Sequence, residues 1–215
     1  MIFKDRFEAG KLLVPYLTKY KNNSDTVVLG LARGGVVTAG AVAQGLHLPL
    51  DVLCPRKIGA PLNPELAIGA ISDQGEPLLN GDLIDQLAVS RQHIDETIAR
   101  ERKIAQARLK KFRQNRKCIP LEGKTVIIVD DGLATGATMR AAIMGVESQG
   151  VERIIVAIPV SPPDTLDEIK KRVDEVVCLA APAYFAAVGQ FYQNFSQTDD
   201  DEVVAVLFAF NNMLI

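Results

Sequence analysis

Two adjacent aspartates, Asp130 and Asp131, follow a run of apolar residues and begin the stretch of this sequence that is best suited to chemistry. The β-branched run at residues 125–129 is typical of a buried strand, so the carboxylates are expected at its end. A pair of carboxylates can accept hydrogen bonds from a vicinal diol, or hold a hard cation such as Mg²⁺ directly or through its waters. The pair therefore predicts a site for a diol, a metal ion or both.

The seven residues after the aspartates suit a phosphate group. They are Gly132, Leu133, Ala134, Thr135, Gly136, Ala137 and Thr138. Small side chains let backbone N–H groups approach an anion closely, and the two threonines add hydroxyl donors. A helix predicted at residues 138–149 would direct the positive end of its dipole at the same anion. A diol beside a phosphate is the chemistry of a ribose 5-phosphate.

A second glycine-rich turn, Ala32-Arg33-Gly34-Gly35, follows an apolar run at residues 26–31. The planar guanidinium of Arg33 suits a pyrophosphate, and Gly34 and Gly35 would give the ligand access to the backbone. By itself the turn is equally compatible with an arginine in solvent ahead of a helix. Its placement after a predicted strand makes it a candidate partner of the acidic pair.

A third segment interrupts the regular pattern of the chain. From residue 56 to residue 81 it carries three Pro and four Gly, and it begins with Arg56 and Lys57. This length exceeds that of an ordinary connection in a compact domain, so the segment is either a functional flap or a small subdomain. Its two initial cations are candidates for binding pyrophosphate or another substrate.

The elements that must position these residues form a repeating pattern. Apolar runs of strand length occur at residues 26–31, 49–53, 125–129, 153–158 and 175–179, and helical patterns at 36–46, 138–149 and 164–172. Uninterrupted apolar strands alternating with helices predict an α/β fold, doubly wound, with a mainly parallel five-stranded sheet flanked by helices. Ligands in such sheets bind at the carboxyl ends of the strands, where the aspartates and both glycine-rich turns lie.

Composition excludes several other classes of function. The chain is 48% hydrophobic and 23% charged, with 24 Lys and Arg against 26 Asp and Glu, so it is expected to fold as one globular domain over residues 1–215, and nucleic acid is not the expected partner. Three scattered cysteines and two histidines favour neither disulfides nor a zinc site, and fit a cytoplasmic protein. The longest apolar run, residues 176–188, contains Pro182, so no membrane span or signal peptide is predicted.

A long helical pattern at residues 90–117 is strongly basic in its second half. Between Arg100 and Lys117 it has nine Lys or Arg and one Glu. A solvated helix face is the simpler interpretation, and a surface for phosphates or a second subunit is the alternative.

The sequence resembles the type I phosphoribosyltransferases over nearly its whole length, from about Phe3 to the C-terminal segment. The apolar strand, acidic pair and Thr-Gly loop at residues 126–138 are similar to the family signature, and Arg33-Gly34-Gly35 to its pyrophosphate loop. Residues 55–81 lie where the family has its hood, the small flap over the active site. The hood is similar to that of an uncharacterised branch called predicted phosphoribosyltransferases. The resemblance also implies a cis peptide between Ala32 and Arg33.

For such an enzyme the resemblance implies Mg²⁺-dependent transfer of the phosphoribosyl group of 5-phosphoribosyl 1-pyrophosphate (PRPP) to an unidentified acceptor, expected to be a nitrogenous base, with release of pyrophosphate. A homodimer is the family expectation. Arg33, Asp130 and Asp131 would be catalytic, and the two aspartates would hold the metal directly or through water. The residues that would bind PRPP are Arg33, Gly34, Gly35, Arg56, Lys57, Asp130, Asp131, Gly132, Leu133, Ala134, Thr135, Gly136, Ala137 and Thr138.

The acceptor is not identified by these motifs. Enzymes that act on 6-oxopurines usually have an Asp at the position of Ala134, which argues against that substrate class. Five aromatics at residues 184–195 could stack on a base, although packing in the core or in a dimer is the favoured interpretation. Two alternatives to an enzyme stay open: a regulator that binds PRPP without turnover, and a degenerate fold that serves in assembly. At the C-terminus, residues 198–202 predict an acidic, capped start to an apolar helix.

Overall fold

The computed structural model describes residues 1–71, 76–114 and 116–211, and five parallel strands form its central sheet. The strands stand in the order β2–β1–β6–β7–β8. In that order they are Leu50–Leu53, Thr26–Leu31, Thr125–Val129, Arg153–Val160 and Glu175–Ala180. The predicted α/β fold with a mainly parallel five-stranded sheet is confirmed, and each strand lies within two residues of its expected bounds.

The first and third predicted strands, β1 and β6, are neighbours in the sheet. Their register pairs Thr26 with Thr125 and Gly30 with Val129, so the turn at Ala32 and the acidic pair leave the same edge of the sheet side by side. The chain runs outward from β1 to β2 on one side, and from β6 to β7 and β8 on the other. This reversal is the topological switch point, where doubly wound sheets bind their ligands.

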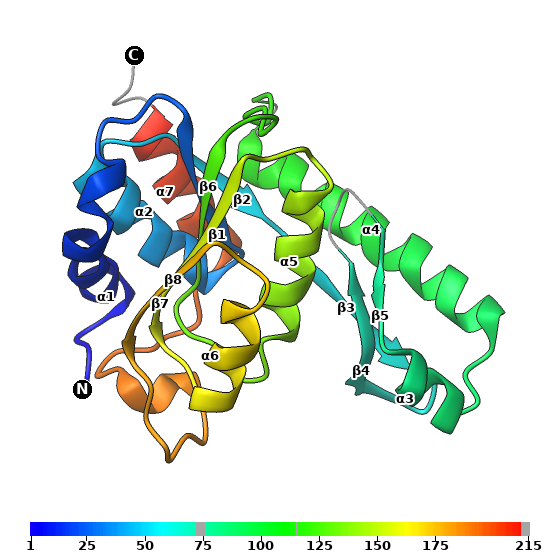
Figure 1. Ribbon diagram of the computed structural model, residues 1–215. Helices are drawn as coiled ribbons and strands as arrows, with labels where there is room; N and C mark the ends of the chain where they lie inside the picture. The colour runs from blue at the N-terminus through cyan, green and yellow to red at the C-terminus, as the bar shows by residue number, and fades with distance from the viewer. Residues whose placement is uncertain (72–75, 115, 212–215) are drawn as a thin grey trace.

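Helices cover both faces of the sheet (Figure 1). On one face lie α1 (Arg6–Leu13), the 3₁₀ helix η1 (Val14–Tyr20), α2 (Gly34–Leu46) and α7 (Asp200–Asn211), and on the other α5 (Ala137–Glu147) and α6 (Pro163–Lys170). Alternate residues of one strand pack against opposite faces: Val28 of β1 contacts the first group and Val27 the second. Both faces of the sheet are therefore buried, as continuous apolar strands require.

The hood, residues 55–81, is a three-stranded antiparallel sheet where the structure describes it. Its strands are β3 (Arg56–Ala60), β4 (Asn63–Ile71) and β5 (Leu78–Leu79), followed by α3 (Gly81–Gln86). Ile58, Ile68 and Ile71 of the hood are fully buried together with Ile94 of α4 (Arg91–Arg113). The segment thus has an apolar core of its own, and α4 forms one side of it (Figure 1).

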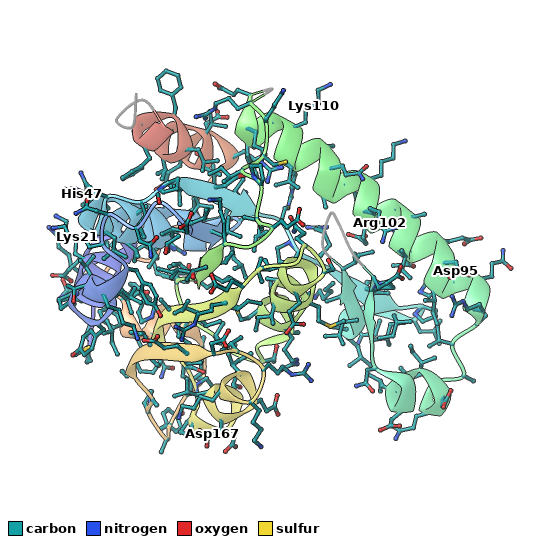
Figure 2. All side chains as sticks on the ribbon, turned by 45° about the horizontal axis from the view of Figure 1, so that its top comes forward. Lys21, His47, Asp95, Arg102, Lys110 and Asp167 are labelled. Carbon is teal, nitrogen blue, oxygen red and sulfur yellow. The ribbon has the colours of Figure 1, made fainter. Side chains whose placement is uncertain are left out.

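The long basic helix α4 is shorter than its pattern predicts. Ser90 caps it at the expected start, but it ends at Arg113, because Gln114 adopts a left-handed conformation, rather than continuing to residue 117. Asp95, Arg102 and Lys110 lie along its length from the hood to the neighbourhood of α7 (Figure 2).

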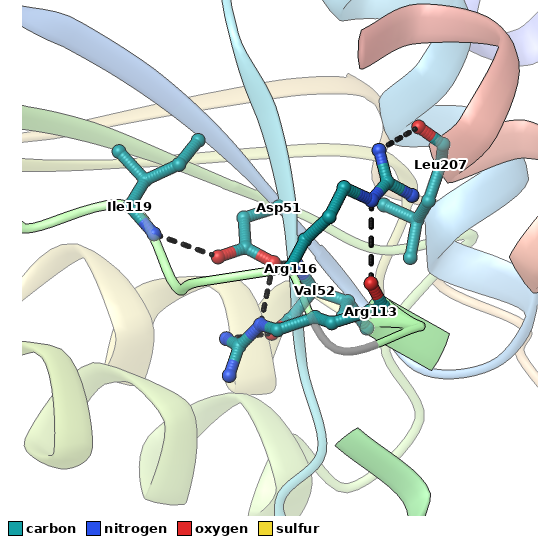
Figure 3. A network of polar contacts seen from close by, with 6 residues as sticks. All are labelled: Asp51, Val52, Arg113, Arg116, Ile119 and Leu207. Carbon is teal, nitrogen blue, oxygen red and sulfur yellow. Dashed lines mark hydrogen bonds and ion pairs between the residues drawn. The ribbon is translucent and has the colours of Figure 1, made fainter. Parts of the chain in front are cut away.

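Part of the basic charge of α4 serves to attach it to the core. Arg113 lies 2.9 Å from the buried Asp51 of edge strand β2, and Arg116 donates hydrogen bonds to the backbone carbonyls of Arg113 and Leu207 (Figure 3). The other oxygen of Asp51 accepts the N–H of Ile119 at 3.2 Å. These contacts give Arg113 and Arg116 a structural role at the end of α4.

The N-terminal segment pairs with the segment around Tyr192 beside the sheet. The N–H of Phe3 donates to the carbonyl of Phe191 at 2.7 Å, and the rings of Phe3 and Tyr192 lie 5.3 Å apart. Phe185, Phe191 and Phe195 pack around them, which confirms that most of the aromatic cluster belongs to the core, whereas Tyr184 is 84% exposed. In the described ranges, no helix has both the length and the apolar character needed to span a membrane.

Candidate active site at the end of β1 and β6

The glycine-rich turn after β1 packs directly on the acidic pair after β6. A methyl group built on Gly35 would lie 2.7 Å from Oδ1 of Asp130, and one on Gly34 would collide with the carboxylate of Asp131. Only glycine therefore allows this approach. The structure brings together the two motifs that the sequence singled out separately, about a hundred residues apart.

Arg6, which the sequence analysis did not identify as a site residue, forms an ion pair with one member of the acidic pair. Its Nε donates to Oδ2 of Asp131 at 2.6 Å, and the two side chains are only 11% and 15% exposed. Tyr192, also missed as a site residue, donates its hydroxyl to the backbone carbonyl of Asp131 at 2.5 Å. No local motif marks either residue, since both act across more than sixty residues of chain.

Burial has the largest effect on the pKa of both aspartates. Burial raises the pKa of Asp130 well above its ordinary value, and the nearby charge of Asp131 adds to the rise. Burial also raises the pKa of Asp131, against the opposing effect of the Arg6 guanidinium. Asp130 is thus the more easily protonated of the two, while Arg6 favours the ionised form of Asp131.

The predicted phosphate loop ends in an open helix N-terminus. Gly136, with φ of 70°, is the N-cap of α5 and offers no side-chain acceptor to the first N–H groups of that helix. Thr135 and Thr138 lie beside it, and the Thr135 hydroxyl is 3.5 Å from the N–H of Ala137. Apart from this long contact at Ala137, the start of α5 has no side-chain cap, so the loop presents backbone N–H donors, hydroxyls and the positive end of the helix dipole together.

Two residues outside the motif hold this loop in place. The hydroxyl of Thr165 in α6 donates to the carbonyl of Ala134 at 2.8 Å, and Arg140 of α5 donates to the carbonyl of Thr135 at 2.9 Å. Both bonds engage carbonyl oxygens of the loop. Of its N–H groups, that of Leu133 donates to the carbonyl of Val160, and that of Ala137 to the hydroxyl of Thr135.

Arg33 lies at the turn between β1 and α2, and the peptide joining it to Ala32 is cis, as the family resemblance implies. The N–H of Ala32 donates to the carbonyl of Leu53, which ties the turn to β2. The Arg33 guanidinium is 3.8 Å from the carboxylate of Asp200, the first residue of α7. The side chain therefore stands at the same sheet edge as the acidic pair, with a carboxylate as its neighbour.

The two cations of the hood stand apart from this group. Arg56 makes an ion pair with Glu101 of α4, with nitrogen to oxygen distances of 2.9 and 3.0 Å, and Lys57 is exposed on the same strand. The predicted role of Arg56 and Lys57 in binding pyrophosphate stays a prediction. In this structure the guanidinium of Arg56 is engaged by Glu101 of α4. Between hood and core there is a cavity of about 370 Å³ that reaches from Leu78 and Asn80 to Ala137 and Arg140.

The chain matches the model of the phosphoribosyl transferase domain over residues 7–195. It belongs to this family. Two Mycobacterium tuberculosis proteins (strains CDC 1551 / Oshkosh and H37Rv), which are named provisionally as phosphoribosyl transferases, are each 45% identical to it over 206 residues. The match covers 96% of this chain and 46% of each relative, so this family member spans about half the length of those curated relatives.

Solved structures give the same fold. The crystal structure of TT1426 from Thermus thermophilus is 40% identical with a TM-score of 0.84, and the match covers 98% of this chain and 99% of that one. The AQ2163 protein from Aquifex aeolicus, at 16% identity and a TM-score of 0.50 over 81% of this chain and 73% of that one, shares the fold alone. The match to TT1426 covers hood and core together, so both parts of the architecture recur in that protein.

Proposed function

We propose that this member of the family is an Mg²⁺-dependent phosphoribosyltransferase, which transfers the phosphoribosyl group of PRPP to a nitrogenous base and releases pyrophosphate. The observation that carries the proposal is the packing of Gly34 and Gly35 on Asp130 and Asp131. It brings a loop suited to pyrophosphate within contact of carboxylates suited to a ribose diol. The phosphate loop at the start of α5 follows directly after the pair.

Each part of PRPP has a matching group at this edge of the sheet. The carboxylates of Asp130 and Asp131 would accept hydrogen bonds from the two ribose hydroxyls. The 5-phosphate would bind the loop from Gly132 to Thr138, where uncapped N–H groups and two hydroxyls gather. Arg33, with the backbone of Gly34 and Gly35, would bind pyrophosphate, and the hood would add Arg56 and Lys57 on closing.

The acidic pair fits a magnesium ion that arrives with the substrate. Within the described residues no group of three or more His, Cys, Asp or Glu is placed to form a complete metal cage, and Arg6 already offsets the charge of Asp131. Mg²⁺ keeps several waters and is usually held by one or two carboxylates together with substrate phosphates. Asp130 and Asp131 would provide two such carboxylates. Bound there, the ion would neutralise charge developing on pyrophosphate.

Catalysis in this site rests on orientation and charge. The lone pair of the acceptor nitrogen forms the new bond to C1 of the ribose while the bond from C1 to the pyrophosphate oxygen breaks, and that electron pair leaves with pyrophosphate. Arg33 would stabilise the leaving charge, and Asp130 and Asp131 would fix the sugar. A closed hood would exclude water, which competes with the base for the same carbon. No covalent intermediate with the protein is required.

Pyrophosphate release tests this function. PRPP and Mg²⁺ are supplied with pooled purine and pyrimidine bases, and the double variant Asp130→Asn, Asp131→Asn is the blank. The proposal expects release above the blank, and dividing the pool then identifies the base. Equal release from wild type and variant would contradict the site. Stabilisation of the wild type by PRPP without release would favour a PRPP-binding regulator instead.

A further inference from the structure

An ion pair joins the first turn of the chain to the centre of the proposed ribose site. Arg6 is the first residue of α1, and its partner Asp131 lies 125 residues away at the end of β6. With a distance of 2.6 Å and exposures of 11% and 15%, the pair is shielded from solvent, unlike the surface pairs of this chain such as Arg91 with Asp95. Shielded pairs with this geometry restrict both side chains far more than exposed ones do.

Arg6 is itself held from three directions. Besides the bond to Asp131, its Nη1 donates to the carbonyl of Ser196 at 2.7 Å, and its guanidinium carbon lies 3.8 Å from the centre of the Phe195 ring. A planar guanidinium can make these three contacts at once, whereas an ammonium group cannot. Because arginine stays protonated at any ordinary pH, the charge beside Asp131 is permanent.

The local sequence directs Arg6 to this place. The side chain of Asp5 accepts the N–H of Glu8 and so starts α1 at Arg6. Just before it, Phe3 exchanges backbone hydrogen bonds with Phe191 and Gln193. The N-terminal segment and the segment carrying Phe195 and Ser196 are thereby joined into one support.

The rest of the chain holds one oxygen of each aspartate in place. Arg6 takes Oδ2 of Asp131, and the N–H of Asp131 takes Oδ1 of Asp130 at 2.8 Å. A further hydrogen bond joins the side chains of Asp130 and Asp131 to each other, so the two carboxylates lie within hydrogen-bond reach of one another. Two oxygens on adjacent residues match the two hydroxyls of a ribose. Arg6 also offsets one of two negative charges that a phosphorylated ligand must approach.

We propose that Arg6 is the positioning residue of the ribose site, which orients Asp131 so that one oxygen of each aspartate is presented to the two hydroxyls of the sugar. This inference rests on the proposed function and adds a residue to it. In this role Arg6 acts through Asp131, whose carboxylate it holds. Its effect is therefore expected on ligands that contain the ribose, and not on pyrophosphate alone.

Calorimetric titration of three ligands tests this role. Ribose 5-phosphate, PRPP with Mg²⁺, and pyrophosphate with Mg²⁺ are titrated into the wild type, Arg6→Gln and Arg6→Lys. Lys11→Gln, an exposed cation of the same helix, is the matched control. We expect Arg6→Gln to weaken both ribose ligands about tenfold, as for the loss of one charge-assisted hydrogen bond, and to change pyrophosphate binding less than about twofold. Arg6→Lys should recover part of the loss.

Three outcomes overturn the inference or what it rests on. Wild-type affinity of Arg6→Gln for ribose 5-phosphate would overturn the positioning role alone. An equal loss of affinity for all three ligands in Arg6→Gln, with no recovery in Arg6→Lys, would show that Arg6 only supports the fold. A wild-type protein that binds neither ribose ligand would overturn the proposed function itself. Should Arg6→Gln fail to fold, Arg6→Lys can replace it, because lysine keeps the charge but cannot make all three contacts. Its affinities then show whether ribose ligands are weakened and pyrophosphate is not.

Discussion

The guanidinium of Arg33 lies 3.8 Å from the carboxylate of Asp200, at the point where the turn after β1 faces the first residue of α7. Lys111 of α4 is bound to the same carboxylate at 3.1 Å. The arginine proposed for pyrophosphate thus has an internal acidic neighbour, which is itself shared with a second cation. A ligand phosphate would compete with Asp200 for Arg33.

Removing this competitor should strengthen pyrophosphate binding. We expect Asp200→Asn to raise the affinity for pyrophosphate with Mg²⁺ about two- to fivefold, the range given by a partly exposed ion pair. Asp201→Asn is the matched control, because Asp201 is 91% exposed and pairs with Lys111. Titration calorimetry measures both. Weaker binding in Asp200→Asn would instead assign Asp200 to orienting Arg33.

The contact of Gly35 with the acidic pair predicts a sharp cost for any side chain there. Besides Oδ1 of Asp130, a methyl group at Gly35 would meet the Cα of Asp130 and the carbonyl of Val129 at 2.9 Å. These backbone atoms cannot move without displacing the end of β6. We expect Gly35→Ala to lower the free energy of unfolding by about 1–3 kcal/mol and to abolish binding of PRPP.

Gly81→Ala is the control for that substitution. Gly81 begins α3, and a methyl group there meets no atom within 4 Å. Its unfolding midpoint in denaturant and its affinity for PRPP should equal those of the wild type. A Gly35→Ala protein as stable and as active as Gly81→Ala would show that the turn after β1 does not pack on Asp130.

Stability should fall with rising pH because of Asp130. Burial holds the pKa of Asp130 above its unfolded value, so between the two pKa values the folded state binds more protons than the unfolded one. The folded protein consequently loses stability as pH rises from the ordinary carboxylate range through the folded pKa. Asp130→Asn keeps an acceptor for the N–H of Asp131 and removes this penalty.

Thermal unfolding across pH measures this effect. The Tm of Asp130→Asn should exceed that of the wild type at pH 8, with the difference shrinking toward pH 4. Asp167→Asn, on the exposed side of α6, should show no such trend. A constant difference at all pH values, or one that grows in acid, would contradict the raised pKa of Asp130.

The ion pair between hood and α4 predicts strong coupling between its partners. Glu101 is buried, and Arg56 contacts it at 2.9 Å. Arg100 also pairs with Glu101 at 3.2 Å, but its side chain is 60% exposed and compensates the loss of Arg56 only in part. Arg56→Gln and Glu101→Gln should therefore each destabilise the protein by about 1–3 kcal/mol. The double variant should lose less than the sum of the two. Additive losses in denaturant unfolding would show that the pair does not join the hood to α4.

The sequence predicted best those features that depend on neighbouring residues. The bounds of β1 and β6 were predicted to the residue, because each is an apolar, β-branched run that ends in a Gly or Asp cluster. The strand-end location of the acidic pair and of Arg33 followed from the parallel topology. The hood could not be assigned as a sheet, since a segment rich in Pro and Gly gives no strand periodicity, although it forms three strands.

Long-range partners lay beyond sequence reasoning. Arg6 contacts Asp131 only because the segment at Phe3 pairs with the segment at Tyr192, and no spacing in the sequence encodes that meeting. The ion pair of Arg56 with Glu101 depends likewise on how α4 packs on the hood. The sequence predicts Arg56 as a pyrophosphate ligand because it is a cation at the start of the hood. In the structure it forms an ion pair with the carboxylate of Glu101.

Calorimetric titration of PRPP with Mg²⁺ shows whether Asp130 and Asp131 bind PRPP. The wild type and the double variant Asp130→Asn, Asp131→Asn are compared at neutral pH, with circular dichroism to confirm that both are folded. We expect saturable binding with one PRPP per chain in the wild type, and at least about a hundredfold weaker binding in the variant, since two charged acceptors are lost. Equal binding by the two proteins, or none by the wild type, would contradict this expectation.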